Sequence, residues 1–315
     1  MTWLLRRLGT SVLLIWAVAT LVFLAIHMIP GDPAELLLSQ TGGAVDQSAL
    51  ENLRQKLGLN EPLHRQYVNA MAGLVKGDLG HSLRDGSPVA EHILTRLPRT
   101  IELIAAAGLI AVAFGVPAGM LAAVNAGGLV DRIVAQVTGL ALAVPVFVIG
   151  TLFIMVFAQT LRWVPAGGFV PFFENPVQHL IMLAMPAFSI GIGLAAMIAR
   201  MTRAAMLDVM SKDFVRTARA KGVGEKTILV RHVLRNALTP VLTVLALHLG
   251  SLLGGTVLVE HVFNWPGLSG FLVSAVGARD YPEVVGIILV ISILLILLNV
   301  VVDVLYAILD PRVRQ

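Results

Sequence analysis

The charged residues leave six long stretches of the chain without any charge. These stretches are 19 to 29 residues long and consist mainly of apolar residues. A helix needs about 20 apolar residues to cross a lipid bilayer, so the pattern predicts an all-α integral membrane protein with six transmembrane helices. The charge-free stretches are residues 8–31, 103–130, 133–161, 175–199, 236–259 and 284–302. The spans are expected at about 9–29, 101–124, 134–158, 179–200, 238–259 and 284–306.

A seventh apolar segment, residues 261–278, is not expected to cross the membrane. It carries no acidic or strongly basic residue, but Pro266 and several glycines interrupt it. A broken helix leaves backbone groups that lipid cannot satisfy. We therefore expect a re-entrant or surface segment here.

The spans divide the chain into three parts. Residues 1–95 comprise the first transmembrane helix and an extracytoplasmic segment between spans 1 and 2. Residues 96–307 form a core with the other five spans, and residues 308–315 form a cytoplasmic tail. In the extracytoplasmic segment, residues 47–57 and the stretch after Pro62 carry apolar side chains at helical spacing, which predicts two surface helices.

Composition and charge narrow the class of protein further. Only 13% of the 315 residues are charged, which excludes a soluble or disordered chain. With the N-terminus inside, cytoplasmic segments hold 14 Lys and Arg against six acidic residues, and extracytoplasmic segments hold 9 against 13. This asymmetry follows the positive-inside rule and places both termini in the cytoplasm. Membrane topology thus explains the basicity without nucleic-acid binding, and the lack of cysteine excludes disulfides and thiolate metal sites.

Residues 200–240 form the most informative loop. Nine basic and three acidic residues are spread through it, so it cannot cross the membrane. Phe214, Val215, Ala218 and Gly222 fall at helical spacing, which predicts short helices on the cytoplasmic surface with a break at Gly222. The composition fits two interpretations equally, an amphipathic loop that binds anionic lipid and a loop that docks a partner protein.

The fifth span carries a candidate translocation pathway or subunit interface. Gly250 and Gly254 have the G-x-x-x-G spacing that permits close helix approach, and His248 and Ser251 are polar groups beside them. Ordinary helix packing and, for His248, a hydrogen bond to a neighbouring helix are the alternatives. Proline inside three expected spans also predicts kinks. These prolines are Pro117, Pro145 and Pro186.

The sequence disfavours a membrane enzyme. Residues 222–227 approach a phosphate-binding loop, but Glu225 stands where glycine is needed, and its carboxylate would repel phosphate. Gly267-Leu-Ser-Gly270 resembles part of an intramembrane serine protease, yet no histidine follows His261 and the adjacent Pro266 favours a turn. No metal site and no cofactor are expected in this chain.

The basic loop carries a recognisable motif. Arg216-Thr-Ala-Arg-Ala-Lys-Gly222 resembles the coupling loop of ABC importer permeases, in the variant of the dipeptide, oligopeptide and nickel branch. Arg235, where other branches have proline, is typical of this branch. Further matches cover nearly the whole chain. They are Ile29-Pro-Gly-Asp-Pro33, Leu57-Gly-Leu59, Gly77-Asp-Leu-Gly80, Asn264-Trp-Pro-Gly-Leu268, Arg279-Asp-Tyr-Pro282 and Leu309-Asp-Pro-Arg-Val-Arg314.

The resemblance implies a type I ABC importer permease fold in the bacterial inner membrane. The implied ATPase-coupling loop consists of Arg216, Thr217, Ala218, Lys221 and Gly222. The implied extracytoplasmic motif consists of Trp265, Pro266 and Gly267. The expected partners are a second homologous permease subunit, two cytoplasmic ATPase subunits that bind ATP and Mg, an extracytoplasmic substrate-binding protein and membrane lipid.

The function that the resemblance implies is ATP-driven import by alternating access. The expected cargo is a dipeptide or a short oligopeptide, and a nickel chelate is the alternative within the same branch. In such systems a separate binding protein sets most of the selectivity. This chain alone therefore does not choose among these cargoes or a glutathione-like peptide.

Overall fold

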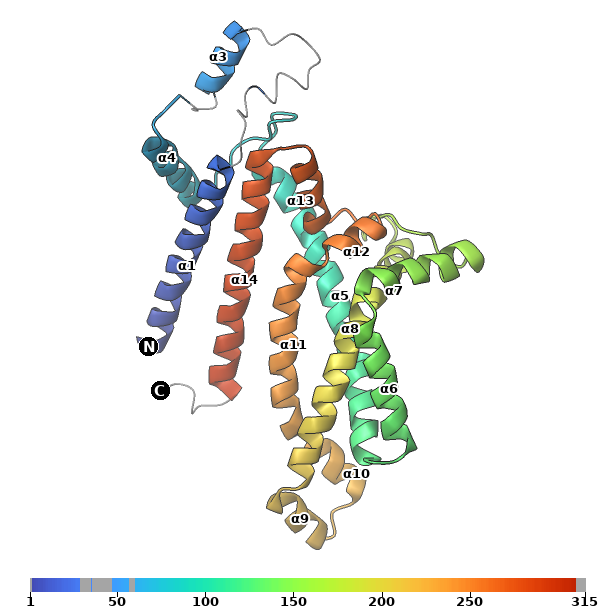
Figure 1. Ribbon diagram of the computed structural model, residues 1–315. Helices are drawn as coiled ribbons and strands as arrows, with labels where there is room; N and C mark the ends of the chain where they lie inside the picture. Colours follow the sequence, from blue (N-terminus) through green and yellow to red (C-terminus); the bar gives the residue numbers. More distant parts are fainter. Residues whose placement is uncertain (1, 29–34, 36–46, 57–59, 310–315) are drawn as a thin grey trace. The chain divides into compact units, whose positions relative to one another are not determined.

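The computed structural model describes residues 2–28, 35, 47–56 and 60–309, and its regular structure in these ranges is helical (Figure 1). The chain folds into two compact units, residues 1–97 with 271–297 and residues 98–270 with 298–315. Two segments, η1 and η2, have the wider winding of a π-helix. In chain order the elements are α1 (Thr2–His27), α3 (Gln47–Lys56), α4 (Leu63–Lys76), α5 (Val89–Val124), α6 (Leu129–Ala143), α7 (Val146–Phe153), η1 (Ile154–Thr160), α8 (Pro176–Met210), α9 (Asp213–Ala220), α10 (Glu225–Thr227), η2 (Ile228–Leu234), α11 (Arg235–Gly255), α12 (Val257–Val262), α13 (Leu268–Gly277) and α14 (Tyr281–Leu309).

Four helical segments in the described part are long and apolar enough to cross a membrane. A fifth crossing exists if α6 and the α7–η1 helix count as one span, although the two are bent by 97°. The apolar part of α1, Gly9–Ala25, is shorter than the about 20 residues of a typical span. The protein is thus an all-helical membrane protein, and the count of six spans stays a prediction. The four segments are Val89–Val124, Pro176–Met210, Glu225–Leu245 and Tyr281–Val300.

The break between α6 and α7 lies at Val144 and Pro145. Val144 is extended, with φ −90° and ψ 125°, as expected for a residue before proline. Pro145 has no N–H to continue the helical hydrogen bonds. The expected kink is therefore a full break, and the span expected at 134–158 is not one straight helix. Pro117 and Pro186, in contrast, lie inside the continuous helices α5 and α8.

In the first unit, α4 packs against α1. The hydroxyl oxygens of Thr20 and Tyr67 lie 2.8 Å apart, and the ring of Phe23 meets that of Tyr67 edge to face. Gly77 ends α4 at φ 77°, a left-handed conformation that favours glycine. The two surface helices expected between spans 1 and 2 are present as α3 and α4.

In the same unit, the loop after α4 and the first turn of α5 are both attached to the start of α14. The Ser82 hydroxyl donates to the Asp280 carboxylate at 2.6 Å, and His92 Nδ1 lies 2.6 Å from Glu283 Oε1. Both carboxyl-bearing residues are buried. Hydrogen bonds of this kind are stronger than neutral ones, so the loop is fastened by polar contacts.

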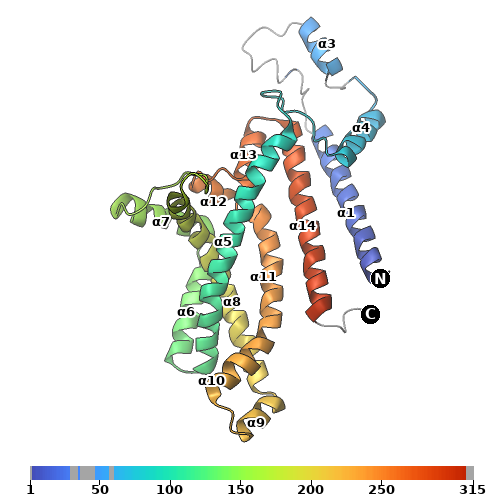
Figure 2. The ribbon, with the colours of Figure 1, turned by 180° about the vertical axis from the view of Figure 1, so that it is seen from behind.

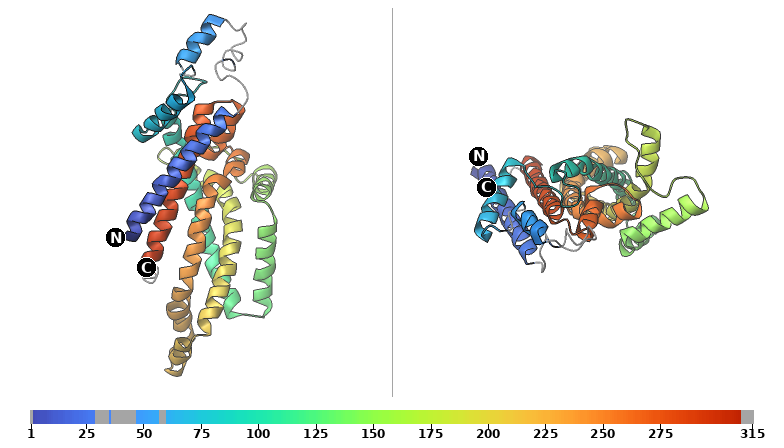
Figure 3. Two further views of the ribbon diagram at one scale, coloured as in Figure 1. Left: turned by 60° about the vertical axis from the view of Figure 1, so that its left-hand side comes forward. Right: turned by 90° about the horizontal axis from the view of Figure 1, so that it is seen from above.

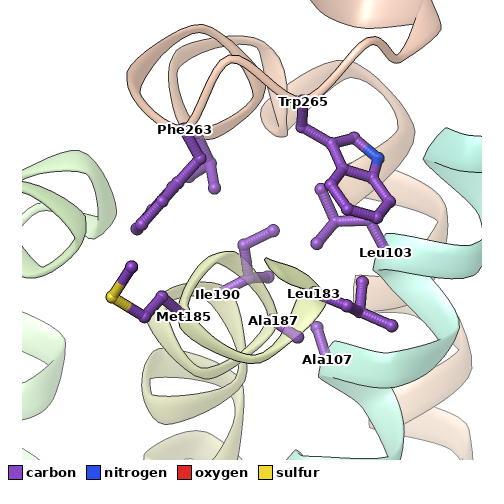
Figure 4. Packing of buried hydrophobic residues seen from close by; sticks show 9 residues of the cluster. Leu103, Ala107, Leu183, Met185, Ala187, Ile190, Phe263 and Trp265 are labelled. Atoms are coloured by element: carbon purple, nitrogen blue, oxygen red, sulfur yellow. The ribbon is translucent and has the colours of Figure 1, made fainter. Parts of the chain in front are cut away.

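In the second unit, α8 packs against α6, α7 and α11, and α6 runs along α8 (Figures 1 and 2). An apolar core joins α5 and α8 to the segment that follows α12, from which Phe263 and Trp265 point toward the helices (Figure 4). Burial of such side chains is the main stabilising term. The buried members of this core are Leu103, Ala107, Leu183, Met185, Ala187, Ile190, Val259, Phe263 and Trp265.

Helices α5 and α8 come closest where both carry small residues. A Cβ atom on Gly115 or Gly119 would overlap the carbonyl oxygen of Ala195 or Ala199, respectively. Glycine at these two positions, spaced as G-x-x-x-G, therefore permits the close crossing. From the sequence we singled out the same spacing at Gly250 and Gly254 of α11, but not at Gly115 and Gly119.

Candidate functional site

The basic loop folds onto the ends of the long helices. Helix α8 ends at Met210, and α9, α10 and η2 follow within a few residues. Val215 of α9 is fully buried, together with Met206 of α8 and Ile228 and Val233 of η2. Ala123 of α5 and Ala237 of α11 complete this cluster, which we call the loop cluster. The loop is thus a packed structure, as its helical spacing predicted.

Helix α9 ends in a turn that requires glycine. Gly222 has φ +77°, its N–H donates to the Arg219 carbonyl at 2.9 Å, and the Val223 N–H donates to the Ala218 carbonyl at 3.2 Å. This pair of hydrogen bonds is the Schellman arrangement, and Val223 and Ala218 both pack against the loop cluster. The break predicted at Gly222 is confirmed.

The five expected coupling residues divide into two groups. Arg216, Thr217, Lys221 and Gly222 are exposed, whereas Ala218 is half-buried against the loop cluster. Their placement makes an outward surface of α9 with Ala218 beneath it. The role of these residues in coupling stays a prediction.

Phe214 is an exposed surface residue, which its helical spacing did not predict. The sequence grouped it with Val215 and Ala218 on one apolar face. In the structure it points outward and 47% of its surface is exposed. A large aromatic side chain on a polar outer surface is the residue type that anchors protein interfaces. Its signal in the sequence was an aromatic residue within a basic helix.

Some basic side chains of the loop form ion pairs, and others do not. Arg219 holds Glu225 with two hydrogen bonds of 2.6 and 3.3 Å, and this contact raises the pKa of the Arg219 guanidinium. Arg216 forms a second ion pair, with its Nη1 atom 3.6 Å from Oδ1 of Asp213. Between Ser211 and Pro240, all of which the structure describes, four exposed cations form no ion pair. They are Lys221, Lys226, Arg231 and Arg235.

A second polar contact ties α6 to α8 near this loop. Arg203 binds both carboxylate oxygens of Asp131, with Nη2 at 2.7 Å from Oδ2, and the Gly127 N–H donates to the same oxygen at 2.8 Å. Two-point contacts between arginine and carboxylate are strong and directional. The turn between α5 and α6 is therefore fixed to α8.

The expected extracytoplasmic motif is buried rather than exposed. Trp265 is 2% exposed and its indole N–H donates to the Arg99 carbonyl at 3.0 Å. Its ring meets those of Phe169 and His179 edge to face. Gly267 lies against the Glu260 carboxylate, which a Cβ at this position would overlap. Pro266 is half-buried, and its carbonyl accepts a hydrogen bond from Arg99 at 3.4 Å.

Glu260 is the partner of this motif that the sequence analysis missed. It is 1% exposed, accepts a hydrogen bond from the Thr100 hydroxyl at 2.7 Å and another from the Gly270 N–H at 2.6 Å. Burial raises the pKa of this carboxyl group, and the hydrogen bonds oppose that shift. Its position five residues before Trp265 was the available signal.

The four residues predicted for a pathway or interface lie in α11. His248 is half-buried and Gly250 is buried. Ser251 and Gly254 belong to the helix, but their side-chain surroundings lie outside the described part. The structure therefore does not test the pathway assignment.

The fold defines a class, the helical membrane proteins. Comparison with known families makes the assignment specific. Residues 115–315 match the model of the binding-protein-dependent transport system inner membrane component, and residues 1–104 match the N-terminal model of such membrane components. The chain belongs to this family. It is a permease subunit of an ABC importer, of the peptide branch, whose ATP hydrolysis is carried by partner subunits.

Several relatives match over the full length. The chain is 42% identical to the glutathione transport system permease protein GsiC of Escherichia coli O6:H1 over 314 residues, which is 100% of this chain and 99% of the relative. It is 41% identical, with the same coverage, to the GsiC proteins of Escherichia coli K12 and Shigella dysenteriae serotype 1.

A solved structure shares the fold. The crystal structure of an amino acid ABC transporter with histidines matches with a TM-score of 0.52, covering 68% of this chain and 92% of the other. At 13% identity, this likeness concerns the fold alone.

Proposed function

We propose that this permease imports short peptides, with glutathione or a peptide of similar size as the cargo. The observation that supports this cargo is the full-length identity of 42% to a permease named for glutathione transport. A dipeptide remains within the same size class. Nothing observed in the described residues favours a nickel chelate.

The proposed complex contains this chain, a second homologous permease, two ATPase subunits and an extracytoplasmic binding protein. ATP and Mg bind the ATPase subunits, and the two permeases alternate between inward-open and outward-open states. The chain lies in the bacterial inner membrane, and we place both of its termini in the cytoplasm because the basic loop dominates the positive-inside count.

The cargo is tested by uptake in cells that lack their own peptide and glutathione importers. The chain is expressed with the permease, ATPase and binding-protein genes that neighbour it, and labelled glutathione, dialanine and nickel are supplied separately. We expect uptake of glutathione or dialanine that stops when the ATPase Walker lysine is replaced. ATP-dependent uptake of nickel without either peptide would overturn the peptide assignment.

In this mechanism the outward surface of α9 docks an ATPase subunit. Phe214 and Thr217 are three residues apart and so share a helical face, and both are exposed. The loop cluster holds this surface in place from below. A shaped interface depends on the position of each side chain, whereas attraction to anionic lipid depends on charge, at about 1 kcal/mol per cation.

Two substitutions separate these possibilities. Phe214→Asp places a charge in the docking surface and should abolish co-purification of the ATPase subunits, whereas Lys226→Ala, the control, removes a cation that forms no ion pair and should preserve it. Gly222→Asp, at φ +77°, should uncouple transport while the chain remains in the membrane. Loss of the partners with Lys226→Ala but not with Phe214→Asp would favour the lipid interpretation.

A further inference from the structure

The α7–η1 helix, residues 146–160, leaves the bundle at a right angle. It is bent by 97° from α6, and Figure 3 shows it extending sideways from the other helices of the second unit. Its base is fixed, because Gly150 lies under the ring of Phe263 with room for no Cβ atom. The direction is therefore set by close packing at the base of the helix.

Both faces of this helix are mainly apolar. The inner face packs against the core with Phe153 and Phe157, among others. The outer face exposes large apolar side chains, and the helix contains no charged residue. The exposed apolar residues are Phe147, Leu152, Met155 and Val156. A helix at a water interface needs a polar face, so water is not the surroundings that this outer face fits.

Both threonine hydroxyls of the helix form hydrogen bonds within it, and its other polar side chain, Gln159, is exposed. The Thr151 hydroxyl donates to the Phe147 carbonyl at 2.9 Å, and the Thr160 hydroxyl donates to the Met155 carbonyl at 2.8 Å. At the break, the Val144 N–H donates to the Leu140 carbonyl and the Val148 N–H to the Pro145 carbonyl. A hydroxyl group that is bonded within its own helix can face lipid without losing a hydrogen bond. Gln159 lies next to the last residue of the helix.

The C-terminal end of the α7–η1 helix carries a basic and an aromatic side chain. Arg162 and Trp163 lie two and three residues after the end of η1, and Trp163 is 71% exposed. Phe173, in the same loop, is 98% exposed. Tryptophan and long basic side chains gather where acyl chains meet headgroups. The end of the helix therefore fits the membrane interface.

From these observations we propose that α7–η1 lies in the plane of the membrane, within the acyl chains of one leaflet, with its tip at the headgroups. The leaflet is the one opposite the basic loop, because α7–η1 leads into the N-terminal end of α8 and the loop follows its C-terminal end. The outer face of α7–η1, which we propose contacts lipid, continues into the outer face of α6. On α6, Ile133, Val137 and Leu140 are exposed.

A second permease subunit is the competing occupant of this face. Helices that pack together within membranes use small residues to bring their backbones close. The exposed face of α7–η1 instead carries phenylalanine, leucine, methionine and valine. The side chains thus favour lipid.

Spin labels at single cysteines test this orientation, since the chain contains no native cysteine. Labels replace Phe147, Thr151 and Met155 in α7–η1 and, as a matched control, Ile133, Val137 and Leu140 in α6. The assembled transporter is placed in liposomes, and depth is measured from relaxation by oxygen and by a water-soluble nickel complex. Variants that retain peptide uptake are compared.

In-plane placement predicts nearly equal depths at positions 147 and 155 and strong relaxation by oxygen. A crossing helix would instead change depth by about 1.5 Å per residue, as we expect along α6, and this gradient in α7–η1 would overturn the proposal. Labels that become immobile and shielded from oxygen only when the second permease is present would also overturn it, in favour of a subunit interface.

Discussion

Glu260 shows how one buried carboxylate can organise a whole segment. It receives hydrogen bonds from Thr100 on α5 and from the backbone at Gly270, while Gly267 leaves the space that it occupies. A buried charge needs such partners, since removing a partner costs more than the bond itself contributes. The motif around Trp265 therefore serves internal packing around this group.

Replacing Gly267 with alanine should destabilise the permease. The added Cβ would overlap the Glu260 carboxylate, and overpacking of this kind costs about 1 to 3 kcal/mol. The thermal unfolding temperature in detergent measures this loss. The control is Gly193→Ala in α8, where a Cβ meets nothing within 4 Å. Equal unfolding temperatures for the two variants would contradict the proposed contact.

Asp85 gives the loop before α5 a dependence on pH. The hydroxyl and N–H of Ser87 donate to its carboxylate and lower its pKa from 3.8 to about 2. A carboxyl group with a lower pKa in the folded state stabilises that state above pH 3.8 and loses this contribution as the pH falls toward 2.

Pepsin cleavage at Leu83 in the same loop reports this effect. In the wild type, we expect cleavage relative to an unfolded reference peptide to stay slow at pH 4 and to rise as the pH falls toward 2. Asp85→Asn should be cleaved faster at pH 4, with a smaller change toward pH 2. The same pH profile in both proteins would argue against the role of Asp85.

At single residues, the sequence identified candidates better than it identified their surroundings. Gly222 was expected to end a helix, and it does so, because a left-handed residue at a helix end depends on local sequence. The outward position of Phe214 and the contact between Gly267 and Glu260 depend on tertiary packing. Spacing along one helix carries no information about such contacts.

Between elements, small residues set which helices can approach. Gly115 and Gly119 allow α5 to meet α8 at Ala195 and Ala199. The G-x-x-x-G spacing in α11 gave the same signal in the sequence, since spacing identifies a helix face without naming its partner. The choice of partner comes from the fold of the whole unit.

Gly119→Leu should therefore separate α5 from α8. A leucine side chain cannot fit beside the Ala199 carbonyl, so we expect less folded protein in the membrane and a lower unfolding temperature. Gly139→Leu in α6 is the matched control, because a Cβ at Gly139 meets nothing within 4 Å. Fluorescence-detected gel filtration compares the two, and an equal loss in both would count against the close crossing.

For the whole molecule, charge distribution predicts the orientation. A reporter fused after Gln315 should be active only in its cytoplasmic form, and a reporter inserted at residue 43 only in its exported form. Both sites lie outside the described residues, so the test is independent of the structure. An exported C-terminus would reverse the positive-inside assignment of the basic loop.

Hydropathy predicted the helical membrane class, because long charge-free stretches have few other uses. It could not predict the right-angle break at Pro145, since proline also occurs within the continuous helices α5 and α8. The direction of the chain after a proline is set by packing with other parts of the fold, which the sequence pattern does not describe. For α7, that packing comes from Phe263, more than 100 residues further along the chain.

The loop cluster joins α9 to three long helices at once, through Ala123 of α5, Met206 of α8 and Ala237 of α11. A tightly packed apolar cluster resists compression and transmits displacement. A push on α9 is consequently shared among all three helices and cannot bend one of them alone. If an ATPase subunit docks on α9, as we propose, its movement would tilt the three helices together as one body.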